Sequence, residues 1–208
     1  ITDMCFQGPE EELKKTYNTQ PAILTVSVAC AAVLKEKGIV PSLAAGHSLG
    51  EYSALVAAGA LDFADAVRLV RKRGQLMQEA VPLGEGAMAA ILGLDSDSIV
   101  RICQEVQAEL GQEVQAVNFN CPGQVVIAGK TAAVETAAAK LKEAGAKRAV
   151  MLPVSAPFHS TLMEPAAKGL AAELDQITIH DAVIPVISTV TGTPLPSAAD
   201  LKRPLVPQ

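Results

Sequence analysis

A serine between two glycines, at a point where a strand-like stretch gives way to a helical one, most constrains how this chain folds. The sequence AAGHSLGEYSALVAAGAL places Gly46 and Gly50 on either side of Ser48, with one residue between each glycine and the serine. A sharp strand-to-helix turn that raises a side chain above a strand end needs glycine, because neighbouring side chains would collide. We therefore expect a strand over 42–46, a helix over 50–58 and a tight turn between them.

The rest of the chain alternates between strand and helix patterns, which indicates the α/β class. Between two flanking segments the predicted order is strand–helix–strand–strand–helix–strand, a ferredoxin-like (βαββαβ) arrangement. We expect this stretch, 85–153, to form an inserted subdomain in a larger body made of 1–84 and 154–208.

Composition narrows the functional classes. Half of the 208 residues are hydrophobic but only 3% are aromatic, so the core must be aliphatic. The formal net charge of −5 disfavours non-specific binding to nucleic acid or to an anionic membrane. The four cysteines form no C-x-x-C pair, and their spacing suits neither a zinc site nor a disulfide scaffold. We expect free thiols in a reducing compartment and no metal.

An apolar run, AILTVSVACAAVL, lies near the start of the chain. At 13 residues it is too short to span a bilayer, and it follows a polar, acidic segment, which is the wrong flank for a signal peptide. We interpret it as a buried helix over 21–37, with Pro21 in its first turn, in a cytoplasmic protein.

The glycine-flanked turn is typical of a serine nucleophile. It exposes the Ser48 hydroxyl and directs the Leu49 N–H, at a helix N-terminus, toward a developing oxyanion. A serine needs a base, and His159 in SAPFHS precedes a helix whose N-terminus favours the neutral imidazole. His47 adjoins the serine, so we interpret it as a supporting group, and His180 as a solvated side chain. A structural turn without chemistry is the alternative.

Residue patterns alone leave two assignments undecided: the group that orients His159 and the arginine that would bind a substrate carboxylate. No acidic residue has a sequence argument for orienting His159, and a backbone carbonyl is able to do this instead. In the segment RKRG, Arg71 and Arg73 both flank the apolar face of a predicted helix. Either would bind a carboxylate substrate through two parallel hydrogen bonds, and periodicity does not choose between them.

Five stretches together resemble a known family: TQPAILT, GHSLGEYSALVAAGAL, VRKRGQLMQEAV, AVNFNCPGQVVIAG and PVSAPFHSTLM. They are similar, in order and spacing, to the malonyl-CoA:acyl-carrier-protein transacylases of bacterial fatty-acid synthesis. The resemblance implies a hydrolase-like, parallel-sheet α/β body with the ferredoxin-like insertion. It also implies transfer of a malonyl group from coenzyme A to the phosphopantetheine thiol of acyl carrier protein, without a bound cofactor, by a monomer.

The resemblance assigns residues as well. It implies that Ser48 is acylated and that His159 is its base, and it selects Arg73 as the ligand of the malonyl carboxylate. The carrier protein is usually acidic, so a basic patch is expected near the site. The other residues that the resemblance implies are Gln20 in the pocket, Asn120 near the substrate channel, Phe158 crowding out branched acyl groups, and Gln208, whose carbonyl orients the histidine. Candidates for the basic patch are Lys130, Lys140, Lys142, Lys147 and Arg148.

The sequence also departs from the family pattern. The family's first strand with its Gly-Gln-Gly loop, which contributes an oxyanion amide, is absent, as are its final strand and helix, so we expect truncated termini. Thr189 stands where many relatives have asparagine. Two alternatives remain at this point: a serine esterase or thioesterase, and a catalytically incomplete fragment that only binds.

Overall fold

The chain forms a mixed α/β structure whose internal contacts divide it into two compact units. Unit 1 comprises Ile1–Leu76 and Ala166–Gln208, and unit 2 comprises Met77–Pro165. The predicted subdomain, 85–153, lies within the bounds of unit 2. The residues described in this computed structural model are 1–82, 84–154, 156–195 and 197–206.

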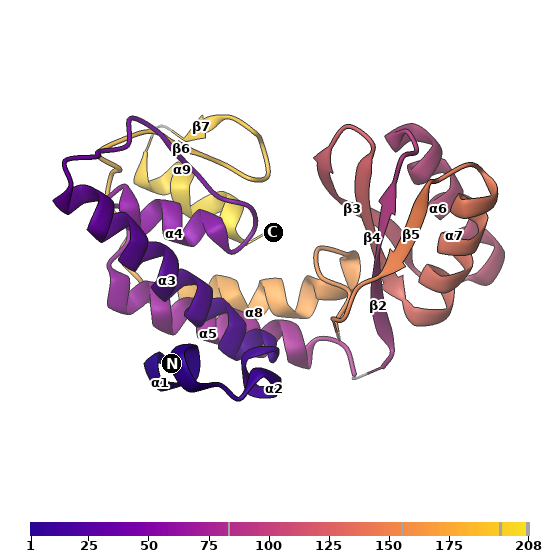
Figure 1. Ribbon diagram of the computed structural model, residues 1–208, viewed down its shortest axis with the longest axis horizontal. Coiled ribbons are helices and arrows are strands. Elements are labelled where there is room, and N and C mark those ends of the chain that lie inside the picture. The colour runs from indigo at the N-terminus through magenta and orange to yellow at the C-terminus, as the bar shows by residue number, and fades with distance from the viewer. Residues whose placement is uncertain (83, 155, 196, 207–208) are drawn as a thin grey trace. The chain divides into compact units, whose positions relative to one another are not determined.

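Unit 2 contains a four-stranded antiparallel sheet in the order β3-β4-β2-β5, with α6 and α7 packed on one face (Figure 1). The sequence pattern of this stretch predicts the same succession of strands and helices. The elements are β2 (Gly86–Leu92), α6 (Ser96–Leu110), β3 (Val114–Cys121), β4 (Gln124–Lys130), α7 (Thr131–Glu143), β5 (Arg148–Met151) and a 3-10 turn, η1 (Thr161–Met163).

Alternation along the central strands places apolar side chains on both faces of this sheet. Ile91 of β2 and Ile127 of β4 are fully buried in a cluster with residues of α6 and α7. The intervening residues Met88 and Val126 point to the opposite face, where Phe158 packs against them. Since strand side chains alternate between faces, both faces of this sheet are at least partly covered.

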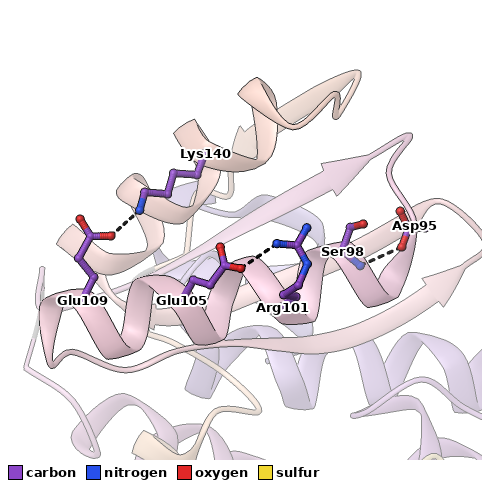
Figure 2. Close-up of polar contacts among 6 residues, drawn as sticks. All are labelled: Asp95, Ser98, Arg101, Glu105, Glu109 and Lys140. Atoms are coloured by element: carbon purple, nitrogen blue, oxygen red, sulfur yellow. Dashed lines mark hydrogen bonds and ion pairs between the residues drawn. The ribbon is translucent and has the colours of Figure 1, made fainter.

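Short-range polar contacts fix the two helices of unit 2 (Figure 2). The Asp95 side chain accepts a hydrogen bond from the Ser98 N–H at 2.8 Å and begins α6 as its N-cap. Lys140 of α7 forms an ion pair with Glu109 of α6. The first contact begins α6, and the second joins α6 to α7 across the two strands that separate them in the chain.

Unit 1 is mostly helical, with a small three-stranded sheet in the order β1-β6-β7. The boundary between the units falls within α5 and near the start of α8. The elements are α1 (Thr2–Gln7), α2 (Glu10–Leu13), α3 (Thr16–Glu36), β1 (Ala44–Ala45), α4 (Gly50–Ala57), α5 (Phe63–Glu79), α8 (Glu164–Asp175), β6 (Val186–Ile187), β7 (Pro194–Leu195), α9 (Ala198–Lys202) and a 3-10 turn, η2 (Arg203–Leu205).

The unit 1 sheet is mixed, whereas the expectation was a parallel sheet. Only β1 and β6 pair in parallel, and β7 pairs antiparallel with β6. Strand β1 is also shorter than the expected 42–46, and β6 is equally short. Pro185 contributes to this because it lacks an N–H, although its carbonyl accepts from the Ala44 N–H at 2.9 Å.

The core of unit 1 lies among α3, α4 and α5. Leu24, Tyr52, Leu55 and Leu69 are buried together in one cluster with residues of α8 and α9. Gly74 of α5 allows α3 to approach closely, because a Cβ at this position would lie 2.5 Å from the Tyr17 Cα. The two helices are therefore near enough for long polar side chains to meet.

Helix α3 differs from the expected buried helix in two ways. It begins at Thr16, so Pro21 lies inside it rather than in its first turn, and after Leu24 it has no buried residue. Ile23 and Val26 are each about half exposed. By length and composition α3 could also cross a membrane, with 28% of the relevant window buried. The expectation of a buried helix is wrong because α3 packs along one side only, through its N-terminal half.

Candidate active site

The predicted turn is present, and its backbone is strained at the serine. Strand β1 ends one residue before Gly46, and α4 begins at Gly50. Ser48 has a φ of 50°, a region that non-glycine residues seldom occupy. A Cβ on Gly46 would lie 1.9 Å from the carbonyl carbon of Gly50, so only glycine fits at the first position. Leu49 is the N-cap of α4, which places its amide at the positive end of the helix dipole.

Arg73 points its guanidinium at this serine. Its Nη2 donates to Ser48 Oγ at 3.0 Å and its Nη1 donates to Gln20 Oε1 at 2.7 Å. The guanidinium also lies over the ring of Tyr52, with Cζ 5.5 Å from the centroid. Of the two arginines that periodicity left open, Arg73 is the one that lies beside Ser48, and the structure brings Arg73, Gln20 and Ser48 together.

The cationic group is buried, since Arg73 is only 4% exposed. Burial lowers the pKa of Arg73, and the neighbouring Tyr52 and Glu51 oppose this decrease. The same burial, with a further contribution from Glu51, raises the pKa of Tyr52 to about 12, while Arg73 acts to lower it. A buried cation that donates to neutral oxygens is suited to receive an anion.

Gln20 is held in place from the helix that carries it. It is buried, and its Nε2 donates to Thr16 Oγ1 one turn earlier on α3, at 3.1 Å. Its Oε1 is therefore directed to Arg73. The close approach of α3 and α5 at Gly74 makes this contact possible.

A hollow of about 290 Å³ lies beside the nucleophile turn. It is located at the carboxyl ends of β1 and β6, the edge at which open α/β sheets bind ligands. The exposed imidazole of His47 borders it, consistent with a side chain that diverges from Ser48. The lining residues are Ala45, Gly46, His47, Ile187, Ser188 and Thr189.

The remaining predicted site residues belong to unit 2 or lie outside the described residues. His159 has a φ of 64°, and among the described residues it shares a positive φ with only one other non-glycine residue, Ser48. Asn120 falls at a register irregularity of β3, and Phe158 packs on the sheet face opposite the helices. Gln208 lies outside the described residues.

Sequence reasoning missed two buried residues beside the serine. Glu51 and Tyr52 are both 0% exposed, in the first turn of α4. Glu51 also accepts a hydrogen bond from the Thr189 N–H, at 2.9 Å. The available signal was a charged residue at the start of an otherwise apolar helix, three positions after Ser48. The predicted exposure of His180 is confirmed.

Comparison with known proteins places the chain in a family. Residues 1–202 match the family described as acyl transferase domain. The chain is 55% identical over 208 residues to the malonyl CoA-acyl carrier protein transacylase of Bacillus subtilis, covering 65% of that protein. It is 61% identical over 185 residues, 88% of the chain, to the Escherichia coli K12 protein of the same name, covering 59% of it. The chain therefore spans about two thirds or less of the length of these relatives.

Solved structures give the same result. A type II PKS acyl-carrier protein in complex with its malonyl-transacylase matches with a TM-score of 0.95 and 55% identity, over 99% of this chain and 66% of that one. The malonyl CoA-acyl carrier protein transacylase from Coxiella burnetii matches with a TM-score of 0.93 and 48% identity, over 96% of this chain and 63% of that one. The chain, with its strained serine turn and buried arginine, belongs to the acyl transferase domain family.

Proposed function

We propose that this chain carries the acyl-transfer site of an enzyme that moves a malonyl group from coenzyme A to the phosphopantetheine thiol of acyl carrier protein. The carrying observation is the buried Arg73 guanidinium, which donates to Ser48 Oγ at 3.0 Å. A cation at that distance from a nucleophile suits an acyl group whose far end is a free carboxylate. The names of the relatives, malonyl CoA-acyl carrier protein transacylases, support the same substrate pair.

The proposed reaction has two steps through an acyl-serine. Ser48 Oγ attacks the thioester carbonyl as His159 takes its proton, and the Leu49 N–H stabilises the oxyanion. The carbon–sulfur bond breaks, and the coenzyme A thiol leaves with the proton from His159. The phosphopantetheine thiol then gives its proton to His159 and attacks the ester, and Ser48 regains its proton. In this proposal the carbonyl of Gln208 orients His159.

Arg73 contributes selectivity. In the resting site its Nη2 donates to the serine, and its Nη1 donates to Gln20. We propose that the malonyl carboxylate replaces Ser48 Oγ as the acceptor for Arg73 while Gln20 keeps its bond, which releases the serine oxygen when the acyl group is in place. Charge-assisted pairing of two parallel hydrogen bonds fixes orientation as well as affinity. Asn120 and Phe158 belong to the proposed substrate channel.

The proposed architecture is a hydrolase-like body, of which unit 1 is part, with a ferredoxin-like subdomain corresponding to unit 2. The succession and antiparallel order of the unit 2 strands support the second assignment. The proposed protein is a monomer in the cytoplasm. The proposed reaction uses no metal or bound cofactor, because Ser48 supplies the nucleophile and the phosphopantetheine arrives with its carrier.

The acidic carrier needs a basic surface. Of the five candidate side chains, Lys130 pairs with Glu85 and Lys140 pairs with Glu109. The proposal therefore concentrates on the other three. These are Lys142, Lys147 and Arg148.

An assay with malonyl-CoA, with and without acyl carrier protein, tests the proposal. We expect malonyl-carrier protein as the main product, and a malonyl adduct on the enzyme when the carrier is omitted. Ser48→Ala should form neither. Rapid release of free malonate would favour the esterase or thioesterase alternative, which has no use for a buried cation, and absence of any adduct would favour a binding fragment.

A further inference from the structure

Thr189, two residues after β6, bonds to the nucleophile turn on both sides of Ser48. Its Oγ1 donates to the carbonyl of Gly46 at 2.7 Å. Its backbone N–H donates to Oε2 of Glu51 at 2.9 Å. Gly46 comes two residues before the serine and Glu51 three residues after it. One residue, far along the chain, thus holds both the entry and the exit of the turn.

The turn needs such support because its own conformation is unfavourable. A non-glycine residue with a φ of 50°, as at Ser48, costs free energy and persists only where the surroundings determine it. The turn closes on itself through the Gly50 N–H, which donates to the His47 carbonyl at 2.9 Å. Those internal bonds do not fix where the turn lies relative to the sheet. The two bonds to Thr189 do so, because Thr189 lies only two residues after β6, the strand that pairs with β1.

Glu51 supplies a rigid anchor for this contact. It is 0% exposed, in the first turn of α4, where the helix dipole favours a negative side chain. Burying a carboxyl group costs free energy unless the group is hydrogen-bonded. The bond from the Thr189 N–H offsets part of this cost for Glu51. Glu51 also opposes the burial effect on the pKa of Arg73, so it interacts with the same site.

We propose that Thr189 and Glu51 are positioning residues that hold the strained turn so that the Ser48 oxygen and the Leu49 N–H keep their reactive geometry. The effect on rate rests on the proposed function, and the effect on the turn rests on the two hydrogen bonds of Thr189. Displacement of a nucleophile by about 1 Å is enough to lower a rate by up to about a hundredfold. The bonds of an exposed threonine are therefore of more consequence for rate than for stability.

The test uses Thr189→Val, which removes the hydroxyl but keeps the shape and the N–H. Thr189→Ser, which keeps the hydroxyl, is the rescue variant. Thr191→Val is the matched control, since the Thr191 Oγ1 in the same loop lies 2.8 Å from the Thr193 Oγ1 and does not contact the turn. In single-turnover acylation by malonyl-CoA we expect Thr189→Val to be slower by about tenfold or more, with KM unchanged. Thr189→Ser should lie within about threefold of the original chain, and Thr191→Val should match it.

Hydrogen exchange of the peptide that spans the turn provides a readout independent of activity. We expect faster exchange over 46–51 in Thr189→Val than in the original chain, in Thr189→Ser or in Thr191→Val. Unchanged exchange, or equal acylation rates for the two valine variants, would overturn the inference. If the original chain itself forms no acyl-serine, the proposed function fails, while the exchange measurement still decides whether Thr189 holds the turn.

Discussion

Arg71 and Arg73 of α5 have the same kinds of neighbours but donate to different groups. Arg71 donates to Asn18 Oδ1 at 2.7 Å and lies 5.5 Å from the ring centroid of Tyr17. Its Nη1 also donates to the Tyr17 carbonyl at 3.4 Å. That carbonyl lacks its usual helical partner, because Pro21, four residues later, has no N–H. Arg71 therefore supplies to the Tyr17 carbonyl the hydrogen bond that Pro21 does not make.

Arg73, two residues later, has the same kinds of neighbours in a different place. An amide oxygen, from Gln20, accepts from it at 2.7 Å, and an aromatic ring, from Tyr52, lies at 5.5 Å. Its second nitrogen donates to Ser48 Oγ instead of a backbone carbonyl. Both arginines leave α5 and pair with an amide oxygen from α3, but Arg73 is the more deeply buried and reaches Tyr52 of α4 and the serine turn, whereas, among the described residues, Arg71 reaches only α3.

Replacing each arginine by methionine separates the two roles most strongly. We expect Arg73→Met to lower kcat/KM for malonyl transfer on the order of a thousandfold, because a desolvated, orienting ion pair is lost. Acetyl transfer should fall much less, since acetyl carries no distal acid. Arg71→Met should keep malonyl transfer within about threefold and lower the free energy of unfolding by about 1 kcal/mol. Equal losses on malonyl and acetyl substrates for Arg73→Met would contradict the role of Arg73 as the partner of the malonyl carboxylate.

The side-chain amides that accept from the two arginines, Gln20 and Asn18, should also differ in their roles, with a smaller effect on malonyl transfer. Gln20→Leu removes the acceptor that orients the Arg73 guanidinium, so we expect malonyl transfer to fall by about tenfold, mainly in KM. Asn18→Ala removes the partner of Arg71 and should leave transfer near its original rate, with a loss of stability of about 1 to 3 kcal/mol. Steady-state kinetics and urea unfolding measure both. A drop in transfer for Asn18→Ala as large as that for Gln20→Leu would refute separate roles.

The buried ring of Tyr52, over which the Arg73 guanidinium lies, predicts an effect on stability that is confined to high pH. Because burial raises the pKa of Tyr52 from 10 to about 12, the folded chain resists losing the phenol proton more than the unfolded chain does. The free energy of unfolding is therefore unaffected below pH 10 and decreases as pH rises from 10 toward 12, by about 1.4 kcal/mol at pH 11. Urea unfolding over this range should show the decrease, and Tyr52→Phe should lack this contribution. Parallel curves for the two chains would contradict the assignment.

The sequence predicts well what short-range rules determine. The turn at Ser48 follows from the spacing of two glycines, and the helix after it ends at Ala57, two residues before Gly59, whose φ is 71°. In unit 2 the elements follow from alternating apolar residues and from helix caps such as Asp95, because both signals lie within the element that they define.

The sequence predicts poorly what depends on contacts between distant segments. The choice of Arg73 over Arg71 depends on how closely α3 approaches α5 at Gly74, which periodicity within α5 does not report. The contact of Thr189 with Glu51 joins residues 138 positions apart. The exposed second half of α3 is another case, because an apolar run of this kind has the same pattern whether one side is covered or both.

A structure of the full chain with malonyl esterified to Ser48 tests the central claim most directly. We expect the Arg73 guanidinium to leave Ser48 Oγ and to donate two hydrogen bonds to the free carboxylate, while Gln20 continues to accept from it. A structure in which the carboxylate faces solvent and Arg73 keeps its resting partners would contradict the account.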